Sequence, residues 1–473
     1  MSEVKKLEKK YELAWDKYAK EDLEKVFALS ERYIDFMSEC KTERECVTKS
    51  IEIAEAKGFK NLKTILANGE TIKAGDKLYS EIMGKSVAMF VIGKDSLEKG
   101  MNILGAHVDS PRIDLKQNPL YEDNGFAMLK THYYGGIKKY QWVNMPLAIH
   151  GVICKKDGTT VNVVFGEDEK EPVVGISDLL IHLSADQMSK TAAKAIEGEQ
   201  LNVCIGSMPI EDKEASDRVK ANALRILNEK YGIEEEDFVS AELEIVPAGR
   251  ARSYGLDSSM VLAYGHDDRV CGYTSLEAIL EIENPQRTSV CLLVDKEEVG
   301  SQGATGAKSK FFENTVAEIL NVMDSNYSDI KVRRSLANSL MLSSDVSAAF
   351  DPNWPSVSDK LNNAFFGKGI VFNKYTGARG KSGCNDANPE FIAHLRKIME
   401  DNNVSWQTSE LGKVDQGGGG TIAYITAEYG MEVIDSGVAL HSMHAPYEIA
   451  SKADIYETCR AYAAFLNDAK PFR

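Results

Sequence analysis

After residue 255, short apolar runs alternate with segments of helical periodicity, and this alternation limits the folds that the chain can adopt. The runs SVCLLV, MLSS, GIVF and MEVI are typical of buried strands, and similar runs, SVAMFVIG and MNILGAHVD, begin at about residue 86. Apolar residues recur at helical spacings near 309–323 and 387–402, and again from about residue 452. This order predicts an α/β fold, with a mixed central sheet covered by helices on both faces.

The remaining segments differ in composition and in the spacing of their apolar residues. Residues 2 to about 57 are rich in Lys, Glu, Ala and Leu and predict two or three amphipathic helices. Between about 114 and 250, runs such as PLAIHGVICKKDGTTVNVVF predict hairpin strands joined by Gly and Asp turns. The 473 residues therefore predict a discontinuous catalytic domain, 1–113 and 251–473, with an inserted β-rich domain at 114–250.

Composition excludes several classes of protein. Lys and Arg number 56 against 72 Asp and Glu, and the net charge of −16 argues against a nucleic acid partner. The sequence has no run of 18 uncharged apolar residues, so we expect no membrane span. The eight cysteines are scattered without a C-x-x-C pair, which favours reduced thiols and a cytoplasmic location.

Five short polar clusters lie at the ends of apolar strands or the starts of helices, where open α/β sheets collect ligands. H-E-x-x-H, G-x-S-x-G and G-x-G-x-x-G patterns are absent. Each cluster contains residue types that bind metals: His107 and Asp109 in GAHVDSPR, Asp267 and Asp268 in GHDDR, Asp295, Glu297 and Glu298 in VDKEEVGS, Asp345 in SSDVS, and His441 and His444 in LHSMHAPYE.

Each cluster also has a simpler interpretation. Asp267 and Asp268 suit a helix N-terminus, and the charges after Val294 suit a solvated turn. Taken together, the clusters supply histidines and carboxylates from distant points of one fold, as zinc, cobalt or manganese sites do. They favour a two-metal hydrolytic site, in which Asp109 orients the ring of His107.

At these residues the sequence resembles the aspartyl aminopeptidase family of two-metal aminopeptidases, and is closest to its bacterial branch. The motifs GAHVDSP, HDDR, DKEEVGS, SSDVS and SMHAPYE occur in the family's order, and the likeness covers nearly the whole chain. The resemblance implies two divalent metal ions, Zn first and Co or Mn as alternatives. It assigns one metal to His107 and Asp345, the other to Glu298 and His444, a bridging role to Asp267, and the general base to Glu297.

The resemblance also implies substrate contacts and an assembly. The loop with Gly419, Gly420 and Thr421 matches a turn whose backbone can bind a peptide main chain, and Lys374, with Arg379, is a candidate for the specificity pocket. His182 matches a position that reaches a neighbouring subunit's site. In the family the segment at 114–250 is a dimerisation domain, and the implied homo-oligomer is a tetrahedral dodecamer built from dimers.

The sequence therefore predicts an aminopeptidase that hydrolyses the N-terminal residue from peptides with a free amino terminus. A related two-metal carboxypeptidase or deacylase is the alternative, and a non-enzymatic assembly protein is a more distant third. Ala445, Pro446 and Tyr447 depart from the aspartyl branch, so the preferred N-terminal residue stays open between acidic, neutral and basic.

Overall fold

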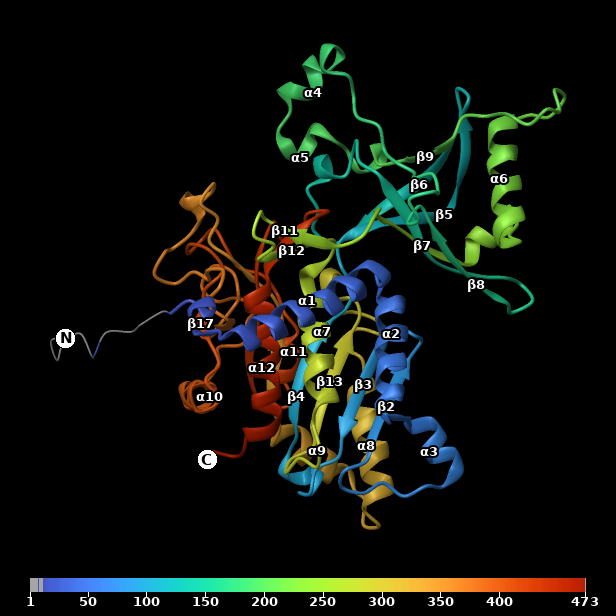
Figure 1. Ribbon diagram of the computed structural model, residues 1–473. Coiled ribbons are helices and arrows are strands. Elements are labelled where there is room, and N and C mark those ends of the chain that lie inside the picture. Colours follow the sequence, from blue (N-terminus) through green and yellow to red (C-terminus); the bar gives the residue numbers. More distant parts are fainter. Residues whose placement is uncertain (1–6, 8–11, 473) are drawn as a thin grey trace.

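The computed structural model describes residue 7 and residues 12–472 (Figure 1). Its largest sheet has nine strands in the order β1-β2-β3-β13-β4-β14-β18-β16-β17. The central strands β13, β4, β14 and β18 run parallel, whereas β3 and β16 lie antiparallel to their central neighbours. The strands are β1 (Lys60–Asn61), β2 (Lys77–Ile82), β3 (Ser86–Val91), β4 (Asn102–His107), β13 (Ser289–Val294), β14 (Leu340–Ser344), β16 (Ile370–Asn373), β17 (Trp406–Thr408) and β18 (Glu432–Gly437).

Burial on both faces explains why the central strands are continuous apolar runs. Every residue of β13 is buried, and successive side chains point to opposite faces. Cys291 and Leu293 pack into the apolar cluster on one face, while Val290 and Leu292 pack into the cluster on the other. Leu104 and Ile103 of β4 divide in the same way.

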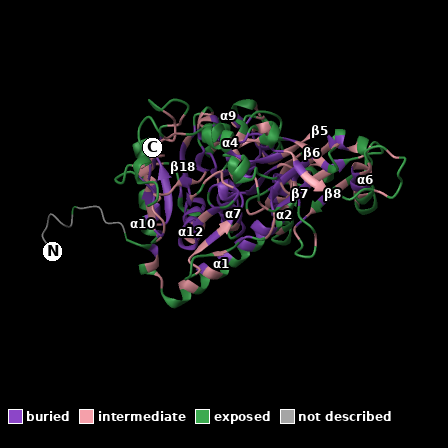
Figure 2. Cartoon of the chain, turned by 90° about the horizontal axis from the view of Figure 1, so that it is seen from above, coloured by how far each residue is buried: buried purple, intermediate pink, exposed green. Residues whose placement is uncertain are grey.

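Helices complete both apolar layers, which confirms the predicted α/β architecture. One layer contains α1 (Lys20–Glu39), α2 (Glu43–Ala56), α7 (His266–Leu280), α10 (Pro389–Asp401) and α12 (Lys452–Asp468). The other contains α3 (Leu62–Asn68), α8 (Phe311–Met323), α9 (Asp329–Ala337) and α11 (Ala423–Ala427). Figure 2 shows that the buried ribbon is concentrated in these layers. The start of α2 follows from sequence, because Thr42 and Glu45 form a capping box.

The segment at 114–250 contributes to a separate antiparallel sheet, which lies beyond one end of the central strands (Figure 1). The order is β8-β7-β10-β5-β6-β9, from β5 (Arg112–Asp123), β6 (Phe126–Tyr134), β7 (Leu147–Cys154), β8 (Thr160–Phe165), β9 (Val203–Gly206) and β10 (Ala241–Pro247). The expected hairpin strands are present. The same segment holds α4 (Ala185–Ser189), α5 (Ala192–Ala195) and α6 (Arg218–Tyr231), of which the 14-residue α6 was not predicted.

A third sheet was also missed by sequence reasoning. Its order is β11-β12-β20-β19-β15, from β11 (Arg252–Tyr254), β12 (Met260–Ala263), β15 (Ser347–Ala348), β19 (Ala439–His441) and β20 (Glu448–Ser451). Strand β12 leads into α7, and the loop between β19 and β20 carries His444. This sheet therefore brings two of the polar clusters toward each other.

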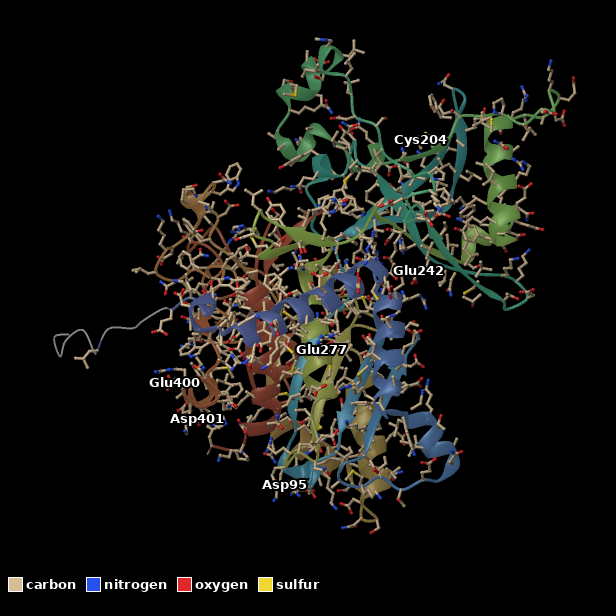
Figure 3. All side chains as sticks on the ribbon, in the orientation of Figure 1. Asp95, Cys204, Glu242, Glu277, Glu400 and Asp401 are labelled. Carbon is tan, nitrogen blue, oxygen red and sulfur yellow. The ribbon has the colours of Figure 1, made fainter. Side chains whose placement is uncertain are left out.

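Short 3-10 helices fill several connections: η2 (Ala14–Lys17), η3 (Leu97–Lys99), η4 (Lys139–Gln141), η5 (Ile181–Leu183), η6 (Gly198–Gln200), η7 (Glu235–Ser240), η8 (Glu297–Val299) and η9 (Pro355–Val357). Among the described helices, none is both long enough and apolar enough to cross a bilayer. All eight cysteines are free thiols, including Cys204 in the 114–250 segment (Figure 3).

Candidate metal centre

The five polar clusters converge near the carboxyl ends of the central parallel strands. His107 is the last residue of β4, Asp345 directly follows β14, and Glu297 and Glu298 begin η8, which is separated from β13 by two residues. Asp267 lies at the start of α7, where its peptide bond to Asp268 is cis. This edge of an open sheet is the place where α/β proteins commonly build their sites.

Asp267 lies between two histidines and directs one carboxylate oxygen toward each. Its Oδ1 is 3.2 Å from Nε2 of His107, and its Oδ2 is 3.2 Å from Nε2 of His444. The Nε2 atom of His444 is also 3.5 Å from Oε1 of Glu298.

These residues form two groups that share Asp267. His107, Asp267 and Asp345 make one group, and Asp267, Glu298 and His444 make the other. Within each group, one potential ligand atom from every residue lies within 4.8 Å of the others. The arrangement offers imidazole nitrogen and carboxylate oxygen to two neighbouring cations, which is the donor set of zinc, cobalt and manganese sites.

The clustered carboxylates of the site also favour the binding of cations. Burial raises the pKa of Glu298, with the charge of Asp267 adding to the shift, and burial together with Asp268 raises the pKa of Asp345. Oε1 of Glu298 is buried without a hydrogen-bond partner. Divalent cations would stabilise the ionised form of these clustered carboxylates, whose charges otherwise repel one another.

Both histidines respond to the same excess of negative charge. Burial alone would lower the pKa of His107, but hydrogen bonds with Asp109 and Asp267 hold it well above its ordinary value. Burial opposes protonation of His444 too, yet Asp267 and Glu298 raise its pKa to about 10. The raised pKa values of both rings show that the carboxylates around them favour a positive charge at this place.

Asp109 holds His107 and the start of η8 together. Nδ1 of His107 lies 2.9 Å from the backbone oxygen of Asp109 and 3.3 Å from its Oδ1. The backbone N–H groups of Glu297 and Glu298 donate to Oδ1 and Oδ2 of Asp109, at 3.1 and 3.2 Å. The remaining nitrogen of His107, Nε2, faces Asp267, as an orienting role for Asp109 requires.

Glu448 is a site residue whose role sequence reasoning missed. Its Oε1 accepts the backbone N–H of His444 at 2.6 Å, and its Oε2 accepts the backbone N–H of Asp267 at 3.0 Å. Burial and the nearby Asp267 raise the pKa of Glu448 to about 8. Glu448 stands four residues after His444 in HAPYE, but only the fold shows that its carboxylate also contacts Asp267.

His444 and His441 occupy different surroundings. His444 joins Asp267 and Glu298, and its Nδ1 lies 2.9 Å from the backbone oxygen of Gly136. His441 instead contacts the backbone oxygen of Phe350 through Nε2 at 2.9 Å and stacks on Phe366. The structure therefore brings only His444 of this pair to the centre.

A cavity of about 500 Å³ opens beside the centre. The predicted residues Gly419, Gly420 and Thr421 line it, together with the base candidate Glu297. Burial raises the pKa of Glu297 to about 7, with His107 opposing the shift and Asp267 adding to it.

The remaining predicted residues lie apart from this cavity. The Lys374 ammonium lies 3.4 Å from a carboxylate oxygen of Asp386 and is about half exposed. Arg379 lines a neighbouring hollow that shares Thr376 and Leu411 with the cavity. His182 is exposed on η5 in the 114–250 segment.

The family model described as aminopeptidase I zinc metalloprotease (M18) matches residues 36–466. The chain belongs to the M18 family of aminopeptidases. A probable M18 family aminopeptidase 1 from Clostridium acetobutylicum is 65% identical, covering 97% of this chain and 99% of the relative. The corresponding relative from Thermotoga maritima is 45% identical, over 96% and 98% of the two chains.

Solved M18 structures show the same fold. The M18 aminopeptidase of T. maritima matches with a TM-score of 0.93 at 43% identity, over 98% of this chain and all of the other. Aminopeptidase I of C. acetobutylicum matches with a TM-score of 0.91 at 63% identity, over 98% and 100%. A structure described as the S. cerevisiae mApe1 dodecamer has a TM-score of 0.75 at 21% identity, over 93% and 96%.

These comparisons confirm the resemblance to a family that includes the aspartyl aminopeptidases, and they confirm the prediction of a metallo-aminopeptidase. They support zinc as the metal of the family. The ligand set, the general base and the substrate contacts stay predictions.

Proposed function

We propose that this M18 enzyme uses two divalent ions, zinc first, held by His107, Asp345, Glu298 and His444, with Asp267 between them. The observation that carries the proposal is the pair of ligand groups sharing Asp267, at the wall of a cavity that also contains Glu297. When bound, the ions supply positive charge that acidifies a water molecule and polarises the scissile carbonyl group.

Glu297 acts as the general base. Its carboxyl group lines the cavity, and its backbone N–H is held by Asp109. A carboxylate with a pKa raised toward neutrality can accept the water's proton and later donate it to the leaving amine. Asp109 contributes by orienting His107 and the start of η8.

The substrate is a peptide with a free amino terminus. The α-amine of a free amino terminus has a pKa of about 7.7–8.0, so its neutral form is accessible near pH 7 and can bind at the metal centre that lines the cavity. Gly419 and Gly420 bring backbone to the cavity wall without side chains, so a peptide main chain can approach closely, with Thr421 beside them. Lys374 and His182 complete the proposed substrate contacts in the assembled enzyme.

The 114–250 segment is proposed as a dimerisation domain inserted into the catalytic domain of 1–113 and 251–473. Its surface exposes a cluster of apolar side chains around His182, namely Leu179, Leu180, Ile181, Leu183 and Met188. Such a patch is typical of a protein interface. A homo-oligomer, built from dimers into a tetrahedral dodecamer, would cover it and bring His182 to a neighbouring site.

A cytoplasmic location is proposed from the eight free thiols, which suit a reducing compartment. Neither a nucleic acid nor a membrane partner is proposed for this acidic chain.

The direct test is hydrolysis of aminoacyl chromophores by chelator-stripped enzyme before and after zinc, cobalt or manganese is added. The panel contains Asp, Glu, Leu, Met, Lys and Arg derivatives, which also reveals the preferred residue. We expect release only after metal is restored. Cleavage of N-acetylated peptides without cleavage of free-amine substrates would instead support the deacylase or carboxypeptidase alternative, and metal uptake without any hydrolysis would contradict the aminopeptidase role.

A further inference from the structure

The end of β6 brings a side chain from the 114–250 segment against the metal centre. The Tyr134 hydroxyl donates to Oδ2 of Asp109 at 2.8 Å. Because the N–H groups of Glu297 and Glu298 donate to the same carboxylate, Asp109 is the common acceptor of Tyr134 and of the backbone that carries the base.

Arg112 holds the ring of Tyr134 in place. The two residues stand opposite each other in the antiparallel pair of β5 and β6, and the guanidinium carbon lies 3.9 Å from the ring centroid. Stacking of this kind favours one orientation of the ring. The hydroxyl therefore approaches Asp109 from a fixed direction.

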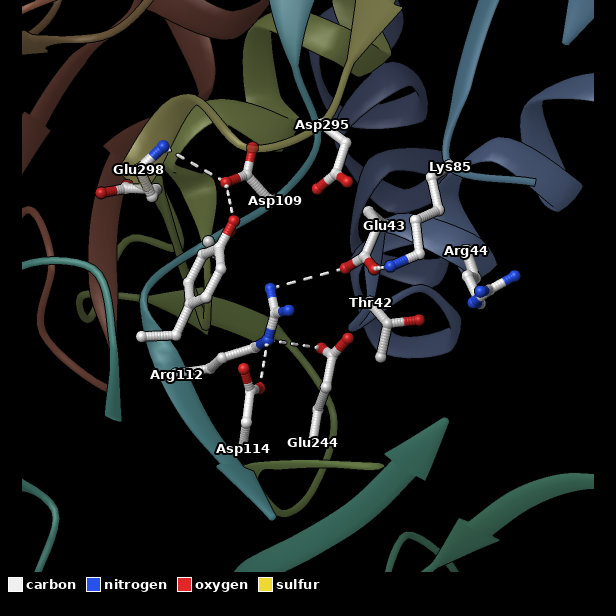
Figure 4. A network of polar contacts seen from close by, with 12 residues as sticks. Thr42, Glu43, Arg44, Lys85, Asp109, Arg112, Asp114, Glu244, Asp295 and Glu298 are labelled. Carbon is white, nitrogen blue, oxygen red and sulfur yellow. Dashed lines mark hydrogen bonds and ion pairs between the residues drawn. The ribbon is translucent and has the colours of Figure 1, made fainter. Parts of the chain in front are cut away.

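Arg112 is itself fixed by carboxylates from three elements, of which those of Glu43 and Glu244 are buried (Figure 4). Its Nε lies 2.7 Å from Asp114 and 3.2 Å from Glu244, and its Nη1 lies 3.5 Å from Glu43. Glu43 belongs to α2, whereas Asp114 and Glu244 belong to β5 and β10. Glu43 and Glu244, together with Glu242, form a third group of clustered carboxylates. Arg112 and Lys85 already supply positive charge to this group, since Lys85 lies 3.4 Å from Glu43 and 2.6 Å from Glu242.

The residues directly after Tyr134 reach the opposite side of the centre. The backbone oxygen of Gly136 lies 2.9 Å from Nδ1 of His444, which leaves Nε2 facing Asp267. One short stretch of the 114–250 segment thus contacts His444 directly and Asp109, the partner of His107, through Tyr134.

We propose that Tyr134 is a positioning residue that holds the backbone of Glu297 in place through Asp109. The inference rests on the proposed role of Glu297 as the base. Without the hydroxyl, the Asp109 carboxylate is held only by the N–H groups of Glu297 and Glu298 and by His107. The acceptor of the Glu297 amide is then fixed less firmly, and so is the Glu297 side chain at the cavity.

The protonation of Tyr134 is consistent with a donor role. Burial raises the pKa of its hydroxyl far above the ordinary value, and the negative charge of Asp109 adds to the shift. The hydroxyl is therefore neutral and available as a donor over the working pH range of proteins.

The test compares Tyr134→Phe with the matched control Tyr133→Phe in the full-length, zinc-loaded enzyme. Tyr133 precedes Tyr134 on the same strand, is 41% exposed, and points to the other face. Four quantities are measured for wild type and both variants: kcat, KM, bound zinc, and amide hydrogen exchange of the peptide that spans 296–300.

We expect Tyr134→Phe to lower kcat about 10- to 100-fold, as loss of a supporting contact commonly does, with KM within about twofold of wild type. Zinc content should be unchanged, and exchange at 296–300 should be faster. Tyr133→Phe should match wild type in all four quantities.

Equal kcat values for the two variants, or unchanged exchange at 296–300, would overturn the inference. A kcat that recovers when zinc is raised would also overturn it, because Tyr134 would then act on metal binding through His107. An inactive wild-type enzyme with full zinc would count against the proposed function instead, so the two failures are distinguishable.

Discussion

At the scale of single residues, Asp267 and Glu297 have different proposed tasks although both line the same cavity. Hydrogen bonds with His107 and His444 keep the pKa of Asp267 low despite burial, so this group stays ionised. Burial instead raises the pKa of Glu297 to about 7, which suits a group that accepts and returns a proton. The opposite pKa shifts of the two carboxyl groups support the proposed roles of Asp267 as a ligand and Glu297 as the base.

Glu297→Gln should separate these tasks. The amide keeps the size of the side chain but cannot accept the water's proton, so we expect kcat to fall by about 10²–10⁴-fold. Because Glu297 is outside both ligand groups, bound metal should match wild type. Turnover close to that of wild type, measured with full metal occupancy, would show that another group is the base.

The sequence pattern was sufficient to select the five clusters that meet at the proposed centre, because each follows an apolar strand or starts a helix. The resemblance to the family was needed to choose His444 over His441. Neither pointed to Tyr134 or to the contact of Glu448 with Asp267. Tyr134 acts on Asp109, 25 residues earlier, and Glu448 acts on Asp267, 181 residues earlier. Such contacts depend on how distant segments pack, which no local pattern records.

At the scale of elements, helix α2 and the residues just before it are joined to the 114–250 segment by partly buried charges. His150 of β7 lies between two carboxylates, with Nδ1 2.8 Å from Glu45 of α2 and Nε2 3.0 Å from Glu167. The Lys41 ammonium lies 2.5 Å from the same Glu167. Although burial opposes it, these two carboxylates raise the pKa of His150.

This contact should make stability depend on pH. Because its pKa is raised on folding, protonated His150 contributes stability fully below its unfolded pKa of about 6.5, and the contribution is lost as pH rises through the folded value. Glu45 and Glu167 have lowered pKa values and stay ionised over this range.

We expect His150→Gln to cost about 1–3 kcal/mol near pH 6 and less near pH 9. The readout is the melting-temperature difference between wild type and variant, measured with saturating metal at both pH values. The exposed His132 of β6 provides the control substitution, His132→Gln. A difference that does not change with pH would exclude this role for His150.

Elements with strong apolar periodicity were predictable, whereas α6 and the third sheet were not. Helix α6 has an apolar face, with Leu224, Leu227 and Tyr231 packed against the core of the 114–250 segment, but it lies between runs that predict hairpin strands. The third sheet contains strands of two to four residues, too short for a period of two to be visible.

At the scale of the whole molecule, the apolar patch around His182 has no partner within the described part of the chain that buries it. Ile181 is 64% exposed and Leu183 is 71% exposed. Figure 2 shows α4, which follows directly, as exposed ribbon. The proposed homo-oligomer provides a cover for this patch.

The double variant Ile181→Asp and Leu183→Asp should therefore shift the protein to smaller particles, because charge is costly in an apolar interface. Light scattering measures the mass directly. Val164→Asp, at another exposed apolar position of the 114–250 segment, is the control and should keep the wild-type mass. A double variant with the wild-type mass would place the subunit interface elsewhere.

The central claim is that two ions share Asp267, and anomalous diffraction from crystals of the zinc-loaded enzyme tests it most directly. We predict two zinc peaks for each chain: one in contact with His107 and Asp345, the other with Glu298 and His444, and both in contact with Asp267. Zn–N distances should be about 2.0–2.1 Å. A single peak at full occupancy, or two peaks that do not share Asp267, would contradict the account.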